Sequence, residues 1–233
     1  MIVLRNVSKV YDLRVTALDD VTLSIPKGDF VFLVGHNGAG KTTLLSLLVR
    51  ADQASSGVVL VGGQDLALLK ESEVPLLRRR FGIVFQDLKL FPKKTVAENV
   101  ALAMQVQGCT GKRAHISAAD ALELVGLQHR ASFLPGQISG GEQRKAAIAR
   151  AIVHRPEIFI ADEPTASLPP EAAWEITCLL MEVNRLGITT LVATHDRDVV
   201  DGFSRRVVAL DNGRIARDVQ IGKFMENGVN ATT

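Results

Sequence analysis

Short apolar runs alternate along this chain with glycines, prolines and polar residues, and later apolar positions recur at helical spacing. The runs within residues 2–34 predict antiparallel strands that lead into a buried strand over 30–34. A helix follows from residue 41. The pattern then predicts strands over 58–61, 81–85, 158–161 and 190–193, helices over 73–80, 96–107, 116–125, 142–154 and 171–186, and a hairpin over 207–219 that turns at Asn212-Gly213.

This order places a helical segment inside a chain that otherwise alternates strands and helices. We expect residues 1–86 to form the first part of an α/β core and residues 87–156 an inserted helical subdomain. Residues 157–222 would complete the core, and residues 223–233 would form a small polar tail without fixed order. A length of 233 residues allows one large domain with such an insertion.

Composition excludes several classes of protein. The net charge of +2 is too close to neutral to favour a nucleic-acid partner. Cys109 and Cys178 lie far apart, which fits a reducing cytosol and not a disulfide scaffold. No apolar run approaches the roughly 18 residues of a membrane span, and the first residues lack a signal-peptide layout. We therefore expect any membrane role to come through a partner.

The strongest chemical signal lies between the apolar run at 30–34 and the helix after it. Gly35 to Thr42 fits G-x-x-x-x-G-K-T, whose glycines let backbone N–H groups close around a phosphate. The helix start adds a partial positive charge. Lys41 can reach the β- and γ-phosphates, and the Thr42 hydroxyl can ligate Mg²⁺. The residues predicted to hold a nucleoside triphosphate are Gly35, His36, Asn37, Gly38, Ala39, Gly40, Lys41, Thr42 and Thr43.

Two carboxylates end the apolar run at 158–161. The carboxyl end of a parallel strand is where open α/β sheets bind ligands. We expect Asp162 to hold Mg²⁺ and Glu163 to accept the proton of an attacking water.

Ser139-Gly140-Gly141-Glu142 supports two interpretations. Ser139 and Glu142 have the S-x-x-E spacing of a capping box, which needs no ligand. The same helix start, opened by two glycines, could bind an anion. Both can hold at once, and Gly140 and Gly141 favour the close approach of a phosphate, since capping does not require glycine.

Taken together, these motifs resemble those of the nucleotide-binding subunits of the ATP-binding cassette (ABC) family over nearly the whole chain. Residues 35–42 match the Walker A motif, 138–142 the signature and 160–164 Walker B, while Gln86 matches the Q-loop and His195 the switch histidine. The resemblance implies a P-loop ATPase core with an N-terminal antiparallel β subdomain and an inserted helical subdomain.

The resemblance also implies roles that the residues alone do not show. Tyr11 would stack on adenine, Gln86 would touch Mg²⁺ or the water, and His195 would hydrogen-bond the γ-phosphate. Ser139, Gly140 and Gly141 would contact ATP bound to a second copy in a head-to-tail dimer. The implied catalytic residues are Lys41, Gln86, Glu163 and His195, and the implied Mg²⁺ ligands are Thr42, Gln86 and Asp162.

Within the family, residues 73–87 resemble the branch that acts in bacterial cell division. That likeness implies a peripheral subunit at the cytoplasmic face of the cell membrane, bound to a membrane protein like FtsX and coupling ATP cycling to peptidoglycan hydrolases outside the cell. The alternatives are a lipoprotein-releasing or macrolide-type exporter and a slowly hydrolysing, nucleotide-gated scaffold. The predicted docking residues, expected to be exposed, are Leu88, Leu90, Phe91 and Pro92.

The chain also departs from the family pattern in two places. Pro169 stands where an aspartate is usual after Walker B, and a proline fixes φ and removes an N–H. Gln143-Arg144-Lys145-Ala146 stands where Gln-Gln-Arg-Val is commoner. The first departure bears on communication between two ATP sites and on turnover, and leaves nucleotide binding untouched.

Overall fold

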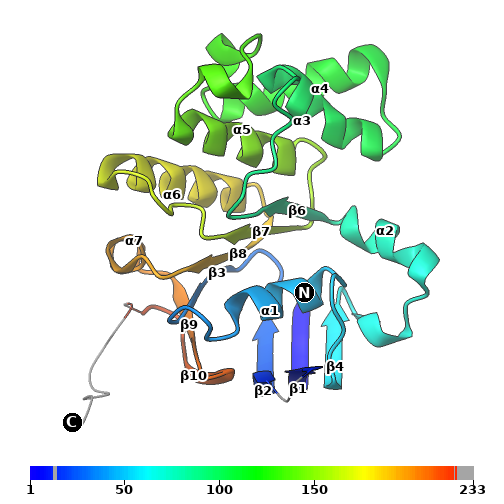
Figure 1. Ribbon diagram of the computed structural model, residues 1–233, viewed down its shortest axis with the longest axis vertical. Coiled ribbons are helices and arrows are strands. Elements are labelled where there is room, and N and C mark those ends of the chain that lie inside the picture. The colour runs from blue at the N-terminus through cyan, green and yellow to red at the C-terminus, as the bar shows by residue number, and fades with distance from the viewer. Residues whose placement is uncertain (13–14, 223, 225–233) are drawn as a thin grey trace. The chain divides into compact units, whose positions relative to one another are not determined.

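The computed structural model describes residues 1–12, 15–222 and 224 (Figure 1). Apart from residue 224, the predicted tail at 223–233 lies outside the described residues. The chain divides into two compact units, and the second consists of residues 26–29 and 68–192. The predicted boundaries at 86/87 and 156/157 both fall inside this second unit and stay a prediction.

The first unit combines an antiparallel sheet with the strand that precedes the phosphate loop. In the antiparallel sheet the strand order is β2-β1-β4-β5. Beside it, β3 pairs with β9 in parallel and β9 pairs with β10 in antiparallel fashion. Its elements are β1 (Ile2–Tyr11), β2 (Val15–Ile25), β3 (Phe30–Val34), α1 (Lys41–Leu48), β4 (Ser56–Val61), β5 (Gln64–Asp65), α7 (Arg197–Phe203), β9 (Arg206–Asp211) and β10 (Arg214–Val219).

The second unit holds parallel strands and most of the helices. β6 pairs with β7 in parallel, with Phe81 opposite Ile158. Its elements are α2 (Val74–Arg78), β6 (Phe81–Val84), α3 (Val96–Val106), α4 (Gly111–Leu124), α5 (Gly140–Ile152), β7 (Ile158–Asp162), α6 (Pro170–Arg185) and most of β8 (Thr189–Thr194). Residues 158–161 are buried without a break, as is typical of strands covered on both faces.

Helix α5 lies at the centre of the helical part of this unit, where it packs against α3, α4, α6 and β6 (Figure 1). Its core positions are mostly alanines, which lets neighbouring elements approach closely; they are Ala146, Ala147, Ile148, Ala149, Ala151 and Ile152. At its C-terminal end a Cβ on Gly82 would lie 2.1 Å from the Ala151 carbonyl oxygen. Glycine at position 82 therefore allows β6 to lie against α5.

Most predicted elements are confirmed, and the differences have physical causes. Helix α4 begins at Gly111 and not at 116, because its first turns are polar and carry no apolar periodicity. The predicted helix at 73–80 is shorter, ending at Arg78 after a 3₁₀ turn over Glu71–Glu73. Helix α7 was missed because its seven residues are too few for a periodic signal. The predicted hairpin turn is confirmed, with φ of 46° at Asn212 and 78° at Gly213.

Candidate active site

The phosphate loop joins β3 to α1, and its glycines are required by the backbone and by packing. A Cβ on Gly35 would lie 2.4 Å from the Leu210 carbonyl oxygen, and one on Gly40 would lie 2.5 Å from that of Ala17. Gly38 and Gly40 have φ of +84° and +107°, which L side chains rarely adopt. No side chain caps α1 at Gly40. The helix start is therefore available to an anion.

Lys41 is folded back over this loop. Its side chain is only 6% exposed, and its Nζ donates to the carbonyl oxygens of Gly35 at 2.8 Å and His36 at 3.2 Å. These carbonyls hold the ammonium group beside the loop, where a phosphate could replace them as the acceptor. His36 itself is exposed, with Nε2 3.2 Å from Asp211 Oδ1 at the end of β9.

Tyr11 lies at the end of β1 and is 40% exposed. The Lys9 ammonium lies 4.8 Å from the centroid of its ring and donates to Asp52 Oδ1 at 2.6 Å. Burial raises the pKa of the Asp52 carboxyl, but hydrogen bonds from Lys9, the Gln53 backbone and Tyr11 outweigh it and leave the pKa below its usual range. The ring is thus held by its neighbours and still offers surface for stacking.

His195 follows β8 directly and is exposed. The next residue fixes the turn, because the Asp196 backbone N–H donates to Thr194 Oγ1 at 3.0 Å and its Oδ1 accepts from the Val199 N–H at 3.2 Å. Asp196 thereby caps α7. Tyr11, the phosphate loop and His195 all belong to the first unit.

The predicted acidic pair ends β7 in the second unit. Asp162 is half-buried, whereas Glu163 is 8% exposed and has a φ of 50°. A left-handed residue other than glycine costs about 1–3 kcal/mol and persists only where its surroundings hold it. Here the buried Arg144 donates from Nη1 to the Glu163 carbonyl and from Nη2 to that of Ala166, both at 3.0 Å. The Arg144 contacts were not predicted, because contacts to main-chain oxygens leave no sequence motif.

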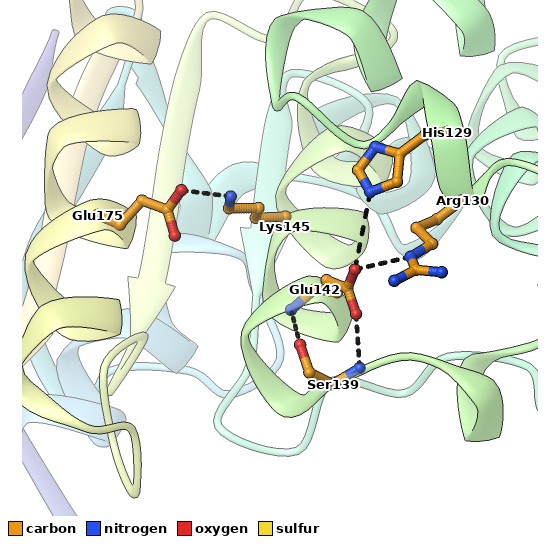
Figure 2. A network of polar contacts seen from close by, with 6 residues as sticks. All are labelled: His129, Arg130, Ser139, Glu142, Lys145 and Glu175. Atoms are coloured by element: carbon orange, nitrogen blue, oxygen red, sulfur yellow. Dashed lines mark hydrogen bonds and ion pairs between the residues drawn. The ribbon is translucent and has the colours of Figure 1, made fainter.

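The signature segment forms the predicted capping box (Figure 2). Ser139 Oγ accepts from the Glu142 N–H at 3.2 Å, and Glu142 Oε2 accepts from the Ser139 N–H at 2.7 Å. Arg130 Nε donates to Glu142 Oε1 at 2.9 Å, and His129 Nε2 lies 3.9 Å from the same oxygen. The Ser139 backbone hydrogen bond, followed by that from Arg130, lowers the pKa of Glu142 to about 2.

The two glycines of the signature have no such structural reason. Nothing lies within 4 Å of a Cβ built on Gly140 or Gly141, and neither has a positive φ. Packing and backbone geometry would accept a side chain at both positions. The open space at Gly140 and Gly141 is compatible with close approach of a ligand, and the anion-binding role stays a prediction.

A cavity of about 440 Å³ opens beside the signature. Signature residues 139–142 form one wall and residues 167–169 another, together with Lys145 and Glu175. Lys145 Nζ lies 2.6 Å from Glu175 Oε1 and so links α5 to α6 (Figure 2). Pro169 precedes α6 with a φ of −59°. The unusual proline thus lines the same cavity as the signature.

A second cavity of about 540 Å³ lies beside Gln86, which is exposed just after β6. Its walls include residues 86–90 and Pro92. The prediction that the apolar residues here are all exposed was partly wrong, since Leu88 and Leu90 are half-buried. Arg150 donates to the carbonyls of Leu88 at 2.5 Å and Lys89 at 2.7 Å, which draws the segment onto α5. Phe91 and Pro92 are exposed as expected.

Comparison with known proteins agrees with these motifs. The profile of the ABC transporter family matches residues 18–166. The chain belongs to the ABC transporter family. It is an ATP-binding protein and an ATPase of that family, with the fold of its cassettes. None of the helices in the described part of the chain has the length and apolar character of a transmembrane segment.

Several relatives match nearly end to end. Identity is 46% with the cell division ATP-binding protein FtsE of Streptococcus pneumoniae strain D39, covering 96% of this chain and 97% of that protein. It is 42% with FtsE of Bacillus subtilis strain 168, covering 96% and 98%. A dimeric post-hydrolysis structure of the ATP-binding cassette MJ0796, bound to ADP and Pi, matches with a TM-score of 0.85 and 34% identity, covering 94% of this chain and 98% of that one.

The low pKa of Glu142 predicts how the unfolding free energy of the protein changes in acid. The folded-state pKa of about 2 lies below the ordinary 4.5, so the stabilisation is present above pH 4.5 and is lost as pH falls toward 2. Between these values the wild type should lose unfolding free energy relative to Glu142→Gln, measured by urea unfolding at each pH. Glu123→Gln, at an exposed position, is the matched control. Parallel profiles for wild type and Glu142→Gln would contradict the assignment.

Proposed function

We propose that this chain is the ATP-hydrolysing subunit of a membrane complex in bacterial cell division, partnered by an integral membrane protein like FtsX. The observation that carries this function is the 41–46% identity to FtsE proteins over nearly the whole chain. ATP cycling in this subunit would then activate peptidoglycan hydrolases outside the cell through the partner. The subunit would lie at the cytoplasmic face of the membrane, held there by the partner.

The phosphate loop would bind the triphosphate of ATP. Its backbone N–H groups and Lys41 would surround the β- and γ-phosphates, and Tyr11 would stack on adenine. The ammonium of Lys41 already lies over the loop, held by two carbonyls, so phosphate binding exchanges one set of acceptors for another. The charge of Lys41 would then also stabilise the negative charge that develops as the phosphoryl group transfers.

Hydrolysis would use Glu163 as the general base. Its carboxylate would take a proton from a water whose oxygen attacks the γ-phosphorus, while the bond from that phosphorus to the β–γ bridging oxygen breaks and ADP leaves. His195 would hydrogen-bond the γ-phosphate. Thr42, Gln86 and Asp162 all offer oxygen atoms, the ligands that Mg²⁺ prefers. When bound there, the ion would neutralise charge on the β- and γ-phosphate oxygens.

A second copy of the chain would complete each site. A solved relative with 34% identity is a dimer bound to ADP and Pi. In the corresponding dimer here, Ser139, Gly140 and Gly141 would face ATP bound to the other copy. The glycines that neither packing nor backbone requires support this contact.

Two variants test the nucleotide site. Lys41→Ala should abolish ATP binding, because it removes the charge over the phosphate loop, whereas Glu163→Gln should preserve binding and lower kcat by about 100-fold or more. Equilibrium binding of a fluorescent ATP analogue and phosphate release measure the two effects. Glu163→Gln should also trap the dimer on ATP, seen by size-exclusion chromatography. Undiminished turnover would refute Glu163 as the base, and unchanged affinity in Lys41→Ala would count against the phosphate loop.

The cavity of about 540 Å³ beside Gln86 is the proposed docking site for the membrane partner, and we call it the docking groove. The backbone of the segment after β6 is held on two sides. Arg150 donates to it on one side, and the fully buried Asn99 binds it on the other. Asn99 Nδ2 donates to the Phe91 carbonyl at 3.1 Å, and its Oδ1 accepts from the Phe91 N–H at 2.7 Å. A docking surface with fixed backbone loses little conformational entropy on binding.

Leu90→Asp should abolish recruitment to membranes while leaving basal ATPase activity intact, because it replaces an apolar side chain of the proposed docking surface with a charged one. Flotation with membranes that contain the partner measures recruitment. Leu68→Asp, at a leucine 81% exposed and outside the groove, is the matched control and should bind as the wild type does. Retained recruitment of Leu90→Asp would refute docking here.

A partner that associates with a lipoprotein carrier or an outer-membrane channel would instead favour a lipoprotein-releasing or macrolide-type exporter.

Pro169 favours a second candidate function, that of a slowly hydrolysing, nucleotide-gated scaffold. It lines the cavity beside the signature where the family usually has an aspartate. If the proline limits turnover, Pro169→Asp should raise kcat and leave ATP affinity unchanged. Pro170→Asp is the matched control, since an acidic residue in the first turn of α6 is compatible with the helix. No gain in rate for Pro169→Asp would argue against the scaffold.

A further inference from the structure

We propose that Arg144 is a positioning residue for ATP hydrolysis, which holds the loop 163–166 and with it the Glu163 carboxylate. This inference rests on the proposed role of Glu163 as the general base. Arg144 lies in the first half of α5, two residues after the signature, and its guanidinium donates hydrogen bonds to two main-chain carbonyls of the loop.

The contact clamps both ends of one tight turn. The Ala166 N–H donates to the Glu163 carbonyl oxygen at 3.2 Å, which closes the turn. The same carbonyl accepts from Arg144 Nη1 at 3.0 Å, and Nη2 donates at 3.0 Å to the carbonyl of Ala166. A planar guanidinium offers separate nitrogens in a fixed fork, so it can bind both carbonyls at once. A glutamine, with a single amide nitrogen, or a lysine cannot reproduce this fork.

The turn needs such a clamp because it starts from an unfavourable backbone. Glu163 has a φ of 50°, and Ser167, just beyond the turn, has a φ of 62°. Left-handed residues other than glycine relax when their surroundings loosen. A change at Glu163 would redirect its side chain, and a misplacement of about 1 Å can cost a catalytic group up to about 100-fold in rate.

Stability alone accounts poorly for this arginine. Its side chain is buried at 7% exposure, and burial lowers the pKa of the guanidinium. Its Nε atom is also buried and makes no hydrogen bond to any described residue. A buried donor without a partner lowers the folding stability, because it has lost its hydrogen bonds to water. Burying the Arg144 guanidinium at the turn therefore lowers folding stability. Such a cost is expected of a residue that serves the active site.

A double-mutant cycle on the full chain with Mg-ATP separates positioning from mere stabilisation. Arg144→Gln should lower kcat about tenfold with KM changed less than about twofold, because the contacts reach the loop and not the phosphate-binding residues. In a Glu163→Gln background the same change should have almost no further effect, since the group it positions is gone. Arg144→Lys, which keeps the charge without the fork, should retain an intermediate kcat and covers the case in which Arg144→Gln does not fold.

The control is Arg206→Gln in the first unit. Arg206 is also buried, at 6% exposure, and donates to Asp218 and to the Ser24 carbonyl. Its loss should lower the melting temperature and leave kcat per folded molecule unchanged. The inference is overturned if Arg144→Gln keeps the wild-type kcat, or if it lowers kcat by the same factor with and without Glu163. Undiminished turnover in Glu163→Gln alone would instead refute the base, a separate and distinguishable result.

Discussion

A guanidinium group removed from water must be surrounded by acceptors, because an uncompensated buried charge costs several kcal/mol. Helix α5 carries Arg144, which is buried, and Arg150, which is half-buried, and burial lowers the pKa of each guanidinium. Within the part of the chain that the structure describes, neither bonds to a carboxylate; both donate to main-chain carbonyls of loops that have no regular structure of their own. Hydrogen bonds from two arginines on one alanine-rich helix thus hold two loops that carry proposed functional residues.

This arrangement anchors the loops through main-chain atoms. The loop after β7 is held through the carbonyl oxygens of Glu163 and Ala166. The segment after β6 is likewise held through Leu88 and Lys89, while Gln86 stays exposed. At the start of α5 the capping box satisfies the backbone of Ser139 with Glu142, and Gly140 and Gly141 remain uncovered. In each case a hydrogen bond to the main chain holds the segment.

Local patterns could predict most of the fold, and they supplied the candidate site residues. The phosphate loop was predictable because its strand, glycines and helix are contiguous, and the capping box because its partners are three residues apart. The clamp by Arg144 was not, since Arg144 and Glu163 are separated by 19 positions and an arginine bound to carbonyls resembles any helical arginine. The half-buried state of Leu88 and Leu90 escaped prediction for the same reason, as it depends on Arg150 far along the chain.

The departures from the family pattern meet in one small region. Arg144 binds the turn at 163–166, and Pro169 fixes φ where the chain leaves that turn for α6. The phosphate loop, by contrast, keeps every glycine that its backbone and packing require. An arginine clamp at one end and a proline at the other both reduce the conformational freedom of the loop that contains the proposed base. Changes of this kind act on the position of a reacting group, so they should alter the rate of hydrolysis and spare the affinity for ATP.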